Sequence, residues 1–127
     1  MIRPPAFMEV LGLTIERADE REVVLRMAVP DFFMSPFGAV HGGAIASLFD
    51  IGLAIAIARR LTPSDRIATH NLSVTYVAFS REQSLVCRAR VASLRRVIAV
   101  AEGEVVTAGE TLVAKALGTF GVRRHTP

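Results

Sequence analysis

The segment from residue 43 to residue 58 constrains the fold more than any other part of this chain. Apart from Ser47 and Asp50, it contains only glycine and apolar residues, and the pair Arg59-Arg60 ends it. A glycine-containing turn leads directly into it. This composition predicts one long helix that is apolar on every side, and such a helix is buried in its protein.

Asp50 is the only charged residue of that predicted helix. An unpaired carboxylate is costly in an apolar interior, so Asp50 either is held by backbone groups or an arginine, or takes part in chemistry. The same helix argues against a membrane protein. It is shorter than the roughly 20 residues that a span needs, and it carries a carboxylate near its centre.

The rest of the chain predicts an antiparallel sheet. Six segments predict strands, at residues 14–16, 22–29, 72–79, 85–93, 97–107 and 111–122. A short helix that starts at Pro4-Pro5 and ends at Gly12 is expected before them. One buried helix beside consecutive antiparallel strands is typical of an α+β fold. We expect the sheet to curl around every side of the helix, within a single domain of residues 1–127.

Composition limits the setting and the partners. The hydrophobic content of 51% is high, which predicts that another subunit covers part of the surface. Cys87 is the only cysteine, and no signal peptide is evident, so we expect a reducing, cytoplasmic environment. The net charge of +3, with fourteen arginines and one lysine, is too small and too evenly spread for nucleic acid. It favours a small phosphorylated ligand.

A Gly-x-x-His-Gly-Gly turn at residues 38–43, followed by Asp50, resembles the hot-dog-fold thioesterases of the phenylacetate-degradation branch. Residues 69–76 and 109–116 resemble the strand after the helix and the last hairpin of that family. The resemblance implies hydrolysis of an acyl- or aryl-coenzyme A (CoA) thioester to free acid and CoA. It also implies no metal and no cofactor, since CoA is part of the substrate, and assembly as a dimer or as a homotetramer made of two dimers.

Thioester hydrolysis needs a group that stabilises the oxyanion and a nucleophile or base. The Gly42 N–H, together with that of Gly43, is expected to polarise the carbonyl at the helix N-terminus, although both glycines could simply form the turn. Asp50 is the expected nucleophile or general base. His41 is expected to orient the turn by bonding a backbone carbonyl, or to assist the departing thiolate. By the resemblance, Thr69 would place the attacking water.

The spacing of these groups predicts a shared site. Asp50 lies seven residues beyond Gly43, which is about 10 Å along a helix. One carbonyl cannot readily touch both from the same chain. If both act, Gly42 and Asp50 belong to different subunits of a homodimer with two active sites, one on each side of a two-fold axis.

The substrate-binding residues follow partly from the same resemblance. Relatives usually carry Asn or Gln six residues before the histidine, where this chain has Ser35. Serine reaches less far and has no amide N–H, which could slow the reaction or shift its specificity. Some of the arginines on the exposed side of the late strands are expected to hold the CoA phosphates, although most surface arginines are simply solvated. The candidate substrate contacts are Ser35, Phe37, Gly43, Arg81, Arg88 and Arg90.

Two other functions are considered. A non-catalytic acyl-CoA binding protein of the same fold would keep the binding residues without hydrolysis. A hot-dog dehydratase or hydratase would need an acid–base histidine facing the substrate. His41, His70 and His125 do not have that spacing relative to Asp50, so this alternative ranks last.

Overall fold

The computed structural model describes residues 6–125. The elements in chain order are α1 (Ala6–Val10), β1 (Leu13–Ala18), β2 (Val23–Ala28), the 3-10 turn η1 (Asp31–Phe33), α2 (Gly42–Ala58), β3 (Arg66–Tyr76), β4 (Ser84–Leu94), β5 (Ile98–Thr107) and β6 (Leu112–Arg123). The predicted elements are all present, with shifted ends. The predicted start of the first helix at Pro4-Pro5 lies outside the described residues.

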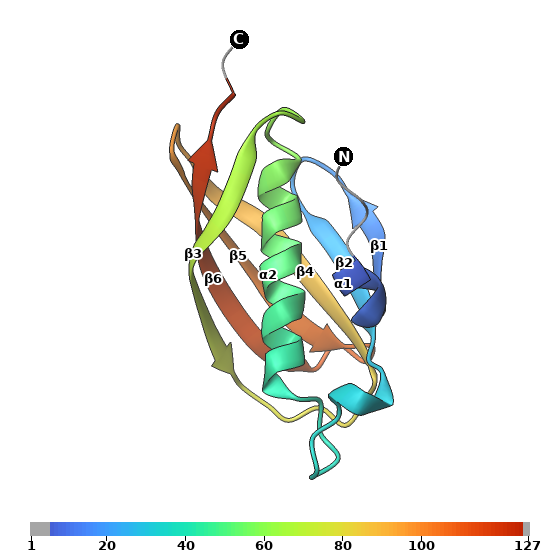
Figure 1. Cartoon of the computed structure of the whole chain (residues 1–127). Helices are drawn as coiled ribbons and strands as arrows, with labels where there is room; N and C mark the ends of the chain where they lie inside the picture. Colours follow the sequence, from blue (N-terminus) through green and yellow to red (C-terminus); the bar gives the residue numbers. More distant parts are fainter. Residues whose placement is uncertain (1–5, 126–127) are drawn as a thin grey trace.

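The six strands form one antiparallel sheet in the order β1-β2-β4-β5-β6-β3. Figure 1 shows the sheet curling behind α2, with β1 and β3 as its two edges. This confirms the predicted α+β architecture of one long helix against a curled sheet. No helix between residues 6 and 125 is both long and apolar enough to cross a membrane.

The core lies between α2 and the inner face of the sheet. Leu48, Phe49, Leu53 and Ile57 of α2 are completely buried there. Burial of each such side chain contributes roughly 1.5–3 kcal/mol. The approach is close, because a Cβ added at Gly118 of β6 would lie 2.9 Å from Leu53 Cδ1.

The sheet does not enclose α2 completely, so that part of the expectation is wrong. One stripe of the helix stays half-buried or exposed, and it consists of Ala46, Ser47, Asp50, Ile51, Ala54, Ile55 and Ala58. The strands curve around one side of α2, and the edge strands β1 and β3 do not meet across the other. This largely apolar stripe, with Asp50 in its middle, is therefore only partly covered by its own chain, and we call it the uncovered stripe of α2.

Candidate active site

The turn before α2 ends in His41, which caps the helix. Its Nδ1 accepts a hydrogen bond of 3.0 Å from the Gly43 N–H. The His41 N–H donates to Phe33 O at 2.9 Å and ties this helix end to η1. Because Nδ1 is the acceptor, we place the proton of the neutral ring on Nε2. His41 therefore orients the turn through a backbone N–H, instead of the carbonyl that the sequence suggested.

Gly42 supplies a backbone donor that remains open. It is the first residue of α2, so its N–H has no acceptor within the helix. Elsewhere in residues 6–125 nothing accepts from it either, whereas the Gly43 N–H is used by His41. The helix dipole adds partial positive charge at this point. Of the two backbone N–H groups predicted to face a ligand, those of Gly42 and Gly43, only the Gly42 N–H is therefore free to donate.

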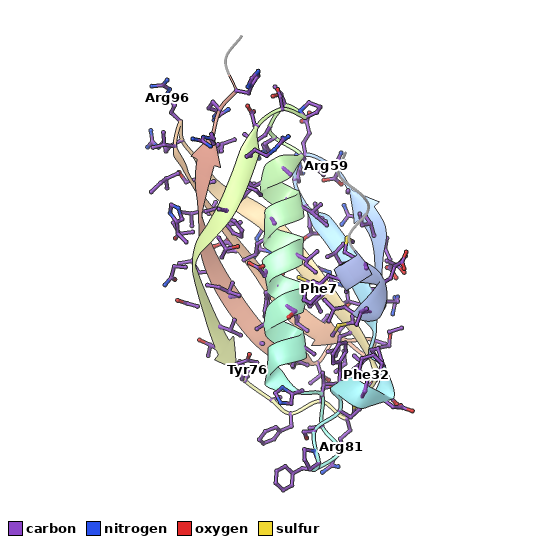
Figure 2. The ribbon with its side chains drawn as sticks, viewed as in Figure 1. Phe7, Phe32, Arg59, Tyr76, Arg81 and Arg96 are labelled. Carbon is purple, nitrogen blue, oxygen red and sulfur yellow. The ribbon has the colours of Figure 1, made fainter. Side chains whose placement is uncertain are left out.

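Tyr76, the last residue of β3, holds the same helix end from the other side. Its hydroxyl donates to Gly42 O at 2.7 Å. The Gly42–Gly43 peptide is therefore fixed twice, by Tyr76 at its carbonyl and by His41 at its N–H. Figure 2 shows Tyr76 beside the N-terminal end of α2. Partial burial raises the pKa of the phenol, which keeps it protonated as a donor at neutral pH.

A hollow of about 460 Å³ opens beside this helix end. We call it the Gly42 hollow; its lining is Ser35, Phe37, Ala39, Val40, His41, Gly42, Phe79 and Arg81. Phe37 and Phe79 project strongly, with exposed fractions of 85% and 95%. Five of the predicted site residues therefore meet in this hollow, namely Ser35, Phe37, His41, Gly42 and Arg81. Apolar and basic side chains together surround the open Gly42 N–H. Such a rim suits a ligand with both apolar and anionic parts.

Ser35 has a local structural role in that lining. Its Oγ accepts hydrogen bonds of 3.3 Å from the Phe37 and Ala39 N–H groups. Arg81 Nη1 holds the same loop through Phe37 O, at 3.2 Å. The Ser35 hydroxyl therefore stabilises the loop, and Ser35 also lines the Gly42 hollow.

Asp50 and Thr69 form the second cluster. Thr69 Oγ1 donates to Asp50 Oδ1 at 2.7 Å, from β3 to the uncovered stripe of α2. Among residues 6–125, no arginine or lysine forms a salt bridge with Asp50, so the structural alternative of a paired arginine is not seen. The same residues contain no group of three His, Cys, Asp or Glu side chains that could hold a metal ion.

The two clusters lie apart within one chain. Gly42 and Asp50 are separated by eight residues of α2, or about 12 Å along the helix axis. The open Gly42 N–H and the Asp50 carboxylate therefore form two separate clusters within one chain, one at the end of α2 and one at its middle.

Arg88 and Arg90 are not at the Gly42 hollow. They alternate along β4 with the buried Cys87 and Ala89, so their side chains lie on the outer face of the sheet. Arg88 donates two hydrogen bonds to Glu110, at 3.0 and 2.6 Å. Arg90 donates to both carboxylate oxygens of Glu104, at 3.0 Å each. Its Nε also lies 3.3 Å from Glu102 Oε2. These carboxylates raise the pKa of both arginines. Of the three predicted arginines, only Arg81 lines the hollow.

Sequence reasoning did not select Tyr76 and Phe79. Tyr76 is the only tyrosine, and it continues the alternation of Leu72 and Val74, which face α2. That alternation was a usable signal that Tyr76 points toward the helix. Phe79 was placed at the end of the predicted strand 72–79, whereas the structure puts it in the loop after β3.

Comparisons with known proteins bear on this site. The model of the thioesterase superfamily matches residues 37–114, which include Gly42, Asp50, Thr69 and Tyr76. A Pseudomonas aeruginosa protein whose name describes it as an esterase is 29% identical over 122 residues, or 94% of this chain and 90% of that one.

Two solved structures add to this. A Ralstonia eutropha protein related to phenylacetic acid degradation and described as a thioesterase has a TM-score of 0.88 and 26% identity, over 94% of this chain and 92% of that one. A Bacillus halodurans protein solved with CoA has a TM-score of 0.75 and 28% identity, over 77% and 69% of the two chains. The chain belongs to the thioesterase superfamily and has its hot-dog fold, as the resemblance in the turn and helix implied.

Proposed function

We propose that this protein hydrolyses an acyl- or aryl-CoA thioester to the free acid and CoA. The observation that carries the proposal is the open Gly42 N–H in a ligand-sized hollow. The same chain holds Asp50, whose only side-chain partner within residues 6–125 is the Thr69 hydroxyl. Membership of the thioesterase superfamily supports the reaction class. The CoA in the Bacillus halodurans relative supports the choice of thiol.

The thioester carbonyl oxygen accepts from the Gly42 N–H, where the helix dipole stabilises the negative charge that develops on it. Asp50 of the other subunit acts on the carbonyl carbon in one of two ways. As a general base, it takes a proton from water while the water oxygen bonds to carbon. The C–S bond then breaks, its electron pair leaves with sulfur, and the proton passes from Asp50 to the thiolate.

In the second route an Asp50 oxygen bonds to the carbonyl carbon, the thiolate leaves, and water then hydrolyses the mixed anhydride. Thr69 serves both routes. Its hydroxyl holds Asp50 Oδ1 and leaves the other carboxylate oxygen for the reaction, and its own lone pairs can position water. His41 lines the same hollow, and its Nε2–H is a donor for the departing sulfur.

A homodimer makes this chemistry possible, because the two halves of each site come from different chains. The uncovered stripe of α2 and the open edge at β3 support such an assembly, since both offer surface that a second copy can cover. The further association of two dimers into a homotetramer is part of the proposal. A measurement of mass in solution tests it directly.

We assign the binding of CoA to the Gly42 hollow. Phe37 and Phe79 offer apolar surface for the pantetheine or adenine, and the Arg81 guanidinium offers donors for phosphate. The alternative function is a non-catalytic acyl-CoA binding protein. It is favoured by Ser35, whose hydroxyl is used by its own loop and has no amide N–H for the thioester.

Release of free thiol from phenylacetyl-, benzoyl-, short-chain and long-chain acyl-CoA thioesters tests the proposal. Turnover by the native protein that is lost in Asp50→Asn, with ligand affinity retained, supports hydrolysis. A matched control is Glu20→Gln, which removes an exposed carboxylate beyond the opposite end of α2 and should leave turnover unchanged. Binding of CoA thioesters without turnover on any of them would establish the alternative function.

A further inference from the structure

A second hollow, of about 400 Å³, opens where β3 begins and β6 ends. We call it the β3–β6 hollow; its lining is Arg66, Ile67, Ala68, His70, Val97, Gly121, Val122 and Arg123. It shares no residue with the Gly42 hollow. In Figure 1 these strand ends lie near the C-terminal end of α2, whereas Gly42 begins the helix at its other end. The two hollows therefore lie at opposite ends of the molecule.

The register of β3 with β6 places two arginines side by side in this hollow. Arg66 is directly opposite Arg123. The next opposed pair, Ile67 and Val122, packs against the core, so alternation directs both arginines to the outer face of the sheet. Opposed residues have Cβ atoms about 4.5–5.5 Å apart, and like charges in such a pair destabilise the sheet.

The carboxylates of the described chain do not neutralise this pair. Within residues 6–125, neither Arg66 nor Arg123 forms a salt bridge. The two glutamates of β5 both pair with Arg90. The Asp65 carboxylate accepts hydrogen bonds from two backbone N–H groups. The fold thus keeps two opposed positive charges without a carboxylate partner from this part of the chain.

The donors of both arginines remain available for a ligand. Arg66 Nη1 donates to Pro63 O and to Asp65 O, at 3.0 Å each, and these bonds hold the guanidinium against its own turn. Its Nε and Nη2 donate to no group in residues 6–125, and neither does any nitrogen of the Arg123 side chain. Guanidinium groups match the geometry of phosphate oxygens, to which they donate two hydrogen bonds at once.

The remaining lining adds a further polar group and an apolar wall. His70 is the extra residue of the β3 bulge, and its ring lies across β6, where a Cβ added at Gly121 would overlap it. Neither ring nitrogen has a hydrogen-bond partner among the described residues. Ala68 and Val97 supply apolar surface. Val97 is 62% exposed, and its carbonyl accepts from the Val122 N–H at 2.8 Å, which holds it beside β6.

We propose that the β3–β6 hollow binds the phosphate monoester of an organic molecule between the Arg66 and Arg123 guanidinium groups. A phosphate monoester carries a charge of about −1.5 to −2 at pH 7, which matches two guanidinium groups, whereas a carboxylate would neutralise only one. A phosphate group alone would leave most of a 400 Å³ hollow empty, and the apolar wall suits an organic body such as a nucleoside. The proposal does not rest on thioester hydrolysis.

Calorimetric titration with adenosine 3′-monophosphate (3′-AMP) tests the site directly, and adenosine is the matched ligand without phosphate. The native protein should bind 3′-AMP about tenfold or more tightly than adenosine, because the phosphate makes charge-assisted hydrogen bonds that adenosine lacks. Equal affinities for the two ligands would overturn the proposal, and so would the absence of binding by 3′-AMP.

Arg123→Gln removes one of the two guanidinium groups and should weaken 3′-AMP binding about tenfold. The matched control is Arg21→Gln, which removes the same charge from an exposed arginine between β1 and β2. Arg21 does not line the β3–β6 hollow and forms no salt bridge within residues 6–125, so its loss should leave the affinity unchanged. Equal losses in both variants would reduce the effect to net charge and overturn the site.

Thermal unfolding separates a binding role of Arg123 from a structural one. Because Arg123 faces a like charge, Arg123→Gln without ligand should melt at the native temperature or slightly above it. Addition of 3′-AMP should raise the melting temperature of the native protein and much less that of the variant. A variant that melts at a lower temperature but binds 3′-AMP like the native protein would show that Arg123 is structural, and would overturn the proposal.

The phosphate monoester has two possible sources, namely the 3′-phosphate of CoA and a separate phosphate ester. If CoA supplies it, CoA should bind more tightly than dephospho-CoA, which lacks the 3′-phosphate, and 3′-AMP should compete with CoA. The difference should vanish in Arg123→Gln. If a separate ester supplies it, CoA and dephospho-CoA should bind equally, and 3′-AMP should bind together with either.

These measurements are independent of the proposed function, because none of them requires turnover. A protein that binds 3′-AMP as predicted but hydrolyses no thioester would keep this site and lose the hydrolase. A protein that hydrolyses thioesters but does not bind 3′-AMP would keep the hydrolase and lose this site.

Discussion

Replacement of Gly42 by alanine separates the catalytic role of this glycine from its structural role. The Gly42 φ angle is not in the left-handed region, so alanine can adopt its backbone conformation. A Cβ at this position would lie 3.4 Å from Tyr76 Cζ and Oη, which is an ordinary contact. The protein itself therefore does not require glycine here. Only a ligand that approaches the backbone closely would require it.

The two expected effects have opposite signs. Stability should stay unchanged or rise by up to about 1 kcal/mol, because alanine loses less backbone entropy than glycine when a helix forms. Activity should fall by about 100-fold or more, as when an oxyanion donor is lost in other enzymes, because the methyl group keeps the carbonyl oxygen away from the N–H. Few structural lesions stabilise a protein while they abolish its turnover.

Thermal unfolding and thiol release from the best CoA thioester measure both effects on the same samples. Gly109→Ala is the control, since a Cβ there would lie 3.9 Å from its nearest neighbour, Thr107 Oγ1, in a turn that does not line the Gly42 hollow. Its turnover should match that of the native protein. Gly42→Ala with turnover within twofold of native would refute the role of the N–H. A large loss of stability would instead refute the inference that the Tyr76 ring leaves room for a methyl group at Gly42.

Three further predictions follow from single contacts. Tyr76→Phe removes the hydrogen bond to Gly42 O, which is worth about 0.5–1.5 kcal/mol, so kcat should fall about two- to tenfold while KM stays nearly unchanged. A rise in KM with kcat unchanged would contradict the role of Tyr76 in positioning the Gly42 peptide. Arg81→Gln should raise KM for a CoA thioester about two- to fivefold but leave an N-acetylcysteamine thioester unaffected, because only CoA carries phosphates; equal effects would exclude phosphate binding. The Asp65 carboxylate accepts hydrogen bonds from two backbone N–H groups, which lower its pKa from 3.8, so its ionised form stabilises the protein above that pH and this stability is lost as the pH falls. The melting temperature of Asp65→Asn should therefore change less between pH 5 and pH 2 than that of the native protein, and parallel profiles for the two proteins would contradict this.

The sequence alone was sufficient where the signal is local. The apolar run at residues 43–58 predicted α2 to within one residue at its start, because an uninterrupted apolar segment of that length has few other ways to fold. Alternation placed β4, β5 and β6 closely as well. The position of β3 was less well predicted, because the bulge at His70 interrupts the alternation that reveals a strand.

The same distinction applies to the candidate site. Asp50 and the turn at His41 stood out because they break an apolar pattern, and the structure places both at distinctive positions of α2. Arg88 and Arg90 could be placed on the outer face by alternation. Their glutamate partners depend on the pairing of β4 with β5 and the hairpin after it, which no local pattern specifies.

The sequence by itself determined the buried helix, the class of fold and the residues that are chemically unusual, because local composition and periodicity encode these directly. Only the tertiary structure decided which groups meet. Thr69 reaches Asp50 because one extra residue at His70 turns it inward, and Tyr76 reaches Gly42 because the curl of β3 brings its end to the start of α2. Both contacts join residues far apart in the chain, and their formation depends on how the sheet bends.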